Sequence, residues 1–93
     1  MIAGMTETDD PIYAVIQVHR AAAVAFDTTP GDHAAAAEFA ALDRLARTEP
    51  RIIAGVIALL RYTQDFPSND LPDGFDRELR RSIWRALTRL CPA

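Results

Sequence analysis

The stretch that decides the fold is IIAGVIALL, residues 52–60, which runs without a polar side chain between Arg51 and Arg61. It is far shorter than the roughly 20 residues that a membrane-spanning helix needs, so we expect no transmembrane segment. Its β-branched residues do not alternate with polar ones, which favours a helix over a strand. A helix that is apolar on every side needs partners on every side. The sequence therefore predicts that other helices surround this one.

Capping and turn signals on either side of this run divide the chain into four helices. Asp10-Pro11 predicts the start of the first helix, because aspartate is a good cap and proline is tolerated in the first turn. Pro30-Gly31 predicts a turn, and Thr48 is the expected cap of the third helix. The predicted fold class is all-α, a compact bundle that starts with a helical hairpin, with helices at about 11–26, 33–47, 49–64 and 75–90. Further expected caps are Asp32 and Asp73.

Length and composition predict a single globular domain. The chain has 93 residues, of which 49% are hydrophobic and 25% charged, values that argue against disorder. We expect residues 1–9 to form a flexible acidic tail and residues 10–93 one helical domain. The net charge of −3 gives no support to binding of nucleic acid or of anionic membranes.

Cysteine content and the first residues favour a cytoplasmic protein. The single cysteine, Cys91, excludes an intramolecular disulfide and a cysteine-cluster metal site. Residues 1–10 lack a basic region and a long apolar core, so we expect no signal peptide. The predicted location is the cytoplasm.

Each amphipathic helix has an apolar stripe that we expect to face the core. Residues spaced by three or four positions lie on the same side of a helix. The predicted inward residues are Ile12, Ile16, His19, Ala23 and Phe26 in the first helix, Ala35, Phe39, Leu42 and Ala46 in the second, and Phe75, Leu79, Ile83, Ala86 and Leu90 in the fourth.

The first and third helices carry more apolar surface than one copy of the chain can bury. The back of the first helix holds Ala14, Val18, Ala21 and Ala25, where a surface helix is usually polar. A second copy is the simplest cover for such faces, so the sequence predicts a homodimer, with an unidentified protein partner as an alternative. The residues predicted for the interface are Val18, Ala21, Ala25, Gly55, Val56, Leu59, Arg81 and Trp84.

Three segments, residues 10–22, 53–62 and 83–87, are similar to the opening, central and closing segments of a group of small all-helical proteins from alpha-proteobacteria. The chain departs from the group at Glu49-Pro50, where the group has a pair of threonines. The resemblance implies a bacterial, cytoplasmic helical protein. It implies no catalytic residue, because no activity is established for the group.

Few residues are candidates for chemistry. His19 lies on the apolar stripe of the first helix and is either a general base or metal ligand or a buried histidine bonded to a carbonyl or carboxylate; we favour the second interpretation. His33 is expected to be exposed. The two histidines lack a metal-binding spacing, and the acidic residues of the long loop lack the pattern of a calcium loop. The sequence therefore predicts no catalytic residue, no cofactor and no metal. The acidic residues in question are Asp65, Asp70, Asp73 and Asp76.

Three classes of function remain open. The first is a non-catalytic interaction or assembly protein that self-associates, which we favour because apolar surface is in excess and a catalytic constellation is missing. The second is a regulatory factor that binds nucleic acid through the last helix, whose five arginines against Asp76 and Glu78 give a local charge of +3. The third is a small enzyme that uses His19. The five arginines are Arg77, Arg80, Arg81, Arg85 and Arg89.

Overall fold

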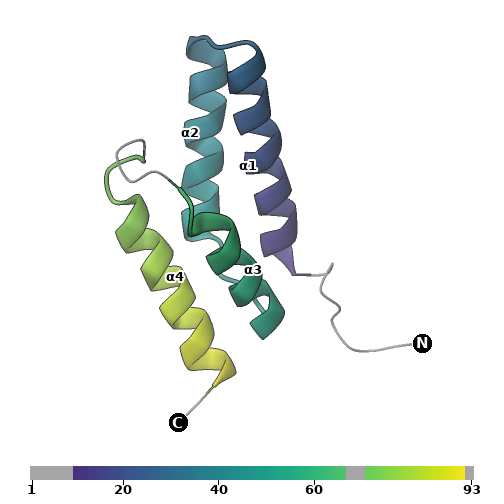
Figure 1. The fold of residues 1–93 in the computed structure, drawn as a ribbon. Helices are drawn as coiled ribbons and strands as arrows, with labels where there is room; N and C mark the ends of the chain where they lie inside the picture. The colour runs from purple at the N-terminus through teal and green to yellow at the C-terminus, as the bar shows by residue number, and fades with distance from the viewer. Residues whose placement is uncertain (1–9, 67–70, 92–93) are drawn as a thin grey trace, which may run out of the picture.

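The computed structural model describes residues 10–66 and 71–91, and over these ranges it consists of four helices without a strand. They are α1 (Pro11–Thr28), α2 (Asp32–Arg47), α3 (Ile53–Thr63) and α4 (Phe75–Leu90). α1 and α2 form an antiparallel hairpin, and α3 and α4 lie against its lower part (Figure 1). The predicted all-α bundle that begins with a hairpin is therefore confirmed. The predicted tail, residues 1–9, lies outside the described residues.

The first helix begins where the sequence predicts. The Asp10 carboxylate accepts a hydrogen bond from the Ile12 amide through Oδ1 at 3.1 Å, and Pro11 occupies the first turn. The helix continues to Thr28, slightly past the expected end, and the Thr28 hydroxyl donates to the Val24 carbonyl at 2.8 Å. The local capping signal is thus sufficient to place the start of α1.

The predicted start of the third helix is wrong. Thr48 is the C-cap of α2 in extended backbone, and its hydroxyl donates to the Arg44 carbonyl at 2.6 Å. α3 begins only at Ile53, because Ile52 before it has extended backbone. The amides of Arg51 and Ile52 donate to the distant Asp10 carboxylate. Two other caps also differ from the expectation: glycines hold the N-cap positions in place of the neighbouring Asp32 and Asp73.

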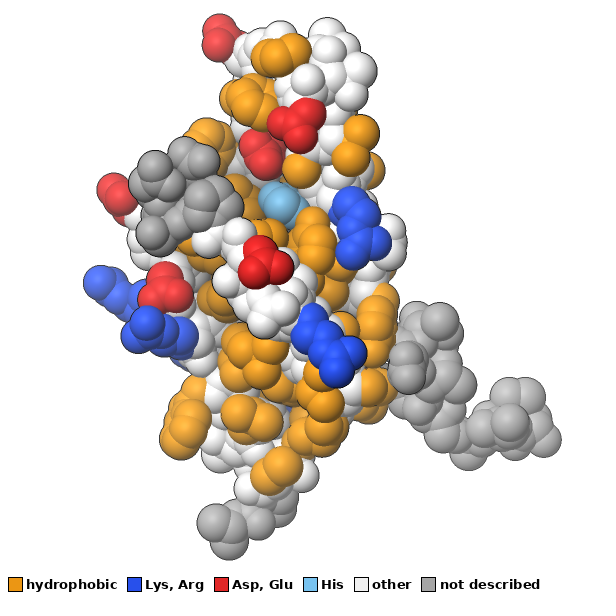
Figure 2. Space-filling model, viewed as in Figure 1, with side chains coloured by type: hydrophobic (Ala, Val, Ile, Leu, Met, Phe, Trp, Pro, Cys, Tyr) orange, Lys and Arg blue, Asp and Glu red, His pale blue; other side chains and the backbone are white. Residues whose placement is uncertain are grey.

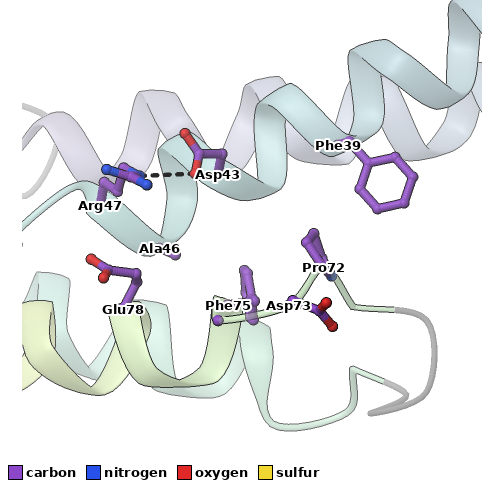
Figure 3. Close-up of a pocket in the computed structure, with 9 residues that line it drawn as sticks. Phe39, Asp43, Ala46, Arg47, Pro72, Asp73, Phe75 and Glu78 are labelled. Carbon is purple, nitrogen blue, oxygen red and sulfur yellow. Dashed lines mark hydrogen bonds and ion pairs between the residues drawn. The ribbon is translucent and has the colours of Figure 1, made fainter.

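The core lies where α1, α2 and the lower two helices meet. The inward stripes predicted for α1 and α4 are confirmed, since their members are buried or half-buried. The prediction for Phe39 of α2 is wrong, because its side chain is 51% exposed. Phe39 lies about one helical turn before Leu42 in α2. Its ring borders a hollow that Pro72 and Phe75, at the start of α4, also line (Figure 3). The core residues are Ile12, Val15, Ile16, Leu42, Leu45, Ala46, Leu59, Phe75 and Leu79.

Candidate functional site

One face of α3 is anchored to the start of α1 by a buried carboxylate. Asp10 is 1% exposed. Besides the Ile12 amide, it accepts hydrogen bonds through Oδ2 from the amides of Arg51 at 2.7 Å and Ile52 at 3.0 Å. The amides of Arg51 and Ile52 lie just before α3, where no bond within the helix is available to them. Asp10 therefore caps α1 and also holds the segment that leads into α3, which is a structural role.

Gly55 is a glycine because Asp10 lies against it. A Cβ atom at this position would overlap the Asp10 carboxylate and would lie 3.1 Å from Cγ2 of Ile12. Sequence analysis places Gly55 in the interface with a second copy of the chain. The close neighbours in the structure are instead Asp10 and Ile12 of the same chain.

The residues predicted for the interface fall into two groups. Gly55, Val56 and Leu59 are buried within the chain itself, so they do not form an outer surface. The other five, Val18, Ala21, Ala25, Arg81 and Trp84, are exposed, and the indole of Trp84 is 72% exposed.

The exposed face of α3 is formed by Ile53, Ile57 and Leu60, hereafter the outer stripe. Their side chains are 41%, 44% and 47% exposed, and their spacing of four and three positions places them in one line along the helix. On the face of the molecule that Figure 2 shows, hydrophobic side chains gather over α3 and over the lower part of α4. Sequence analysis missed this stripe because every side of the helix is apolar, so the pattern does not show which side is outward.

His19 is a buried polar residue within α1, and it contacts the C-terminal end of α3. Its ring is 4% exposed, and Nδ1 is 2.6 Å from the hydroxyl of Tyr62, in a hydrogen bond whose donor depends on the tautomer. Phe66 packs on the imidazole with 5.4 Å between ring centroids. Nε2 is buried and has no hydrogen-bond partner among the described residues. The sequence interpretation of His19 as a buried histidine is thus supported, but its partner is a tyrosine hydroxyl.

A carboxylate faces the unpaired nitrogen of His19 without reaching it. Oε2 of Glu38 is 3.9 Å from Nε2, a separation too long for a hydrogen bond. Burial lowers the pKa of His19, so the neutral imidazole is favoured. Burial also raises the pKa of Tyr62, against the opposing effect of Arg20, whose guanidinium carbon is 5.3 Å from the centroid of the tyrosine ring. His19 and Tyr62 are therefore both uncharged near neutral pH.

A hollow with a volume of about 500 Å³ opens beside His19 between the hairpin and the chain that follows α3. Its walls combine three phenylalanines and other apolar side chains with two carboxylates, those of Asp27 and Glu38. We call this the His19 hollow. The remaining lining residues are Phe26, Ala35, Phe39, Leu42, Phe66 and Leu71.

A smaller hollow, of about 240 Å³, lies on the other side of Phe39 between α2 and the start of α4 (Figure 3). Two of the charged side chains that line it are paired with each other, since Nε of Arg47 donates to the Asp43 carboxylate at 2.8 Å. The two hollows therefore differ in chemistry: the smaller one contains a satisfied ion pair, whereas the His19 hollow contains an unpaired buried nitrogen.

The arginines of α4 are largely engaged within the chain. Arg80 pairs with Asp76 at 2.9 Å and Arg81 with Glu78 at 3.5 Å. Arg89 pairs with Glu49 at 3.0 Å and donates to the carbonyl of Pro50 at 2.7 Å. These contacts reduce the positive charge that the last helix offers to a polyanion.

Comparison of the chain with protein-family models, with curated proteins and with solved structures finds no match. The resemblance described for residues 10–22, 53–62 and 83–87 thus stays a prediction. Among residues 10–66 and 71–91, no helix has both the length and the apolar character that crossing a membrane requires. Within the same ranges, no three metal-ligating side chains lie together.

Proposed function

We propose that this chain is a helical interaction protein that self-associates, and that two copies pair through the outer stripe of α3. The observation that carries the proposal is the alignment of three large, half-exposed apolar side chains on a helix whose opposite face is fully occupied. Such a stripe is typical of a surface that another helix covers. The members are Ile53, Ile57 and Leu60.

A second copy of the chain fits this surface better than a charged partner. No charged residue occurs between Arg51 and Arg61, so the exposed face of α3 is apolar along its length. The molecule is thin, with a shortest extent of 18 Å, and α3 lies at its surface. In an antiparallel two-fold pair, Ile57 lies at the axis and Ile53 faces Leu60 of the second copy. An apolar stripe of this kind matches a second copy of itself and offers no partner to a charged surface.

The energetics require more than the stripe alone. Covering a half-exposed Ile or Leu contributes about 1 kcal/mol, so six such side chains in a two-fold pair contribute about 6 kcal/mol. Association itself costs roughly 4–15 kcal/mol. The pair therefore needs additional apolar contact from α4, where Trp84 is 72% exposed and Ile83 and Leu87 are half-buried. Aromatic side chains of this kind often dominate an interface.

Sedimentation velocity at several concentrations tests the proposal. We expect wild type to sediment as a dimer at micromolar concentration and Ile57→Glu as a monomer, because a charge at the two-fold axis would meet its own copy. Val24→Glu is the matched control: Val24 is an exposed apolar residue of α1, 60% exposed, and its substitution should leave the dimer intact. A wild-type monomer at all concentrations contradicts the proposal, and dissociation by Val24→Glu alone places the interface on α1.

A further inference from the structure

We propose that the His19 hollow binds a small organic amine, a compact apolar body that carries one protonated amino group. The inference goes beyond the proposed self-association, since the hollow is lined by α1, α2 and the residues that flank the loop, and by none of the outer stripe. Three features of the hollow lead to this class of ligand: its walls, its charge and the unpaired nitrogen of His19.

The walls suit an apolar body of modest size. A volume of about 500 Å³ lies in the range of small-molecule sites, which are mostly apolar with a few placed polar groups. Phe26, Phe39 and Phe66 bring three aromatic rings to the hollow, and Leu42 and Leu71 add aliphatic surface. Aromatic faces also attract an ammonium group.

The charge of the walls selects a cation. Asp27 and Glu38 are the charged residues that line the hollow, and no arginine lies among the described lining residues. Arg20, the nearest cation considered above, is instead placed over the ring of Tyr62. An anionic ligand would meet two carboxylates without compensation, whereas an ammonium group would pair with them.

Nε2 of His19 has no solvent-exposed surface, so a bridging donor reaches it only after the imidazole or the Glu38 side chain turns toward the hollow. Oε2 of Glu38 and Nε2 of His19 are 3.9 Å apart, so a single nitrogen placed between them can lie within hydrogen-bond distance of both. An ammonium group donates to the carboxylate and to the lone pair of Nε2. In that tautomer Nδ1–H donates to the hydroxyl oxygen of Tyr62, so the contact at 2.6 Å is kept.

Binding of phenethylamine to the full-length chain tests the proposal, with phenylacetate and 2-phenylethanol as probes of the same apolar body. Titration calorimetry gives the affinity, and long-range ¹H–¹⁵N spectra of the histidine rings report on Nε2. We expect phenethylamine to shift the Nε2 resonance of His19 and to leave that of the exposed His33 unchanged. The affinity for phenylacetate should be weaker by about tenfold or more, because its carboxylate lacks a partner.

Two variants locate the site. Glu38→Gln should weaken phenethylamine binding by about tenfold or more, because a charge-assisted bond is lost. Asp43→Asn removes a carboxylate from the same helix outside the hollow and should leave binding unchanged. The proposal is overturned if phenethylamine does not bind, if phenylacetate binds as tightly, or if Glu38→Gln has no effect while both variants keep the wild-type circular dichroism spectrum.

Discussion

The two faces of α3 differ in how completely other residues of the chain cover them. The inner face meets two buried polar residues, the N-cap of α1 and a residue within that helix: Gly55 lies against Asp10, and Tyr62 is hydrogen-bonded to His19. The outer face presents Ile53 and Ile57, with Leu60, to the surface. Both faces are equally apolar in sequence, so hydrophobicity alone does not distinguish a core contact from a surface. The contacts with the buried polar residues Asp10 and His19 identify the inner face.

The two anchors on the inner face also differ from each other. Asp10 accepts hydrogen bonds from three backbone amides, and both of its carboxylate oxygens are engaged. His19 has one partner and one buried nitrogen without a partner among the described residues. A saturated buried group stabilises the fold, whereas an unsaturated one beside a hollow is a candidate for ligand binding. The predictions below separate these roles.

The largest effect is expected from Asp10→Ala. The substitution leaves the amides of Ile12, Arg51 and Ile52 without their acceptor, and each buried unpaired donor costs about 1–3 kcal/mol. We expect the free energy of unfolding to fall by about 3 kcal/mol or more, measured by urea denaturation. Asp10→Asn keeps one acceptor oxygen and should lose less. A loss below about 1 kcal/mol for Asp10→Ala would mean that the anchor is dispensable.

Gly55→Ala should also destabilise the chain, although alanine favours a helix by about 1 kcal/mol over glycine. The added Cβ overlaps the Asp10 carboxylate, and overpacking of this kind costs about 1–3 kcal/mol. The control is Gly31→Ala, where no atom lies within 4 Å of the added Cβ; its effect should stay below about 1 kcal/mol. Equal stability of the two variants in urea would contradict the close approach of α1 and α3.

His19 should make the stability of the fold depend on pH. Burial lowers its pKa below the ordinary value of 6.5, so near and below that pH the unfolded chain binds more protons than the folded one. The stability that the neutral imidazole contributes to the fold is fully present above pH 6.5 and is lost as the pH falls below this value. We expect His19→Phe to lose less stability than wild type between pH 7 and pH 5 in urea denaturation. His33→Gln is the control and should follow wild type; if it flattens the pH dependence instead, the titrating group is not His19.

The smallest effect is expected from Tyr62→Phe. Removal of the hydroxyl takes away the partner of Nδ1 at 2.6 Å but keeps the ring packed edge-on against the imidazole. A single hydrogen bond contributes about 0.5–1.5 kcal/mol, so the free energy of unfolding should decrease by about 1 kcal/mol. A loss as large as that of Asp10→Ala would remove the distinction drawn between the two anchors.

Local signals in the sequence were sufficient for the number and approximate bounds of the helices, but not for every helix start or for the contacts between helices. Asp10-Pro11 predicts the start of α1 because capping depends on neighbouring residues. The start of α3 could not be predicted in the same way, since the acceptor for the Arg51 and Ile52 amides is 41 and 42 positions away. Thr48 has the right chemistry for a cap, but it ends α2.

The candidate site could be predicted only in part. The position of His19 on an apolar stripe identifies it as buried, which the structure confirms. Its neighbours Tyr62 and Phe66 follow 43 and 47 positions later, and no spacing rule connects them. The exposure of Phe39 depends on where α4 begins along α2, which is a property of tertiary packing.

The central claim, that the outer stripe of α3 pairs with itself, is tested most directly by a cysteine at the proposed two-fold axis. In a Cys91→Ser background, which removes the exposed native thiol, Ile57→Cys is oxidised and the products are separated on a non-reducing gel. We predict that a covalent dimer forms readily with Ile57→Cys and only weakly with Val24→Cys on the exposed face of α1. A covalent dimer that forms equally well from both positions, or from neither, would contradict the account.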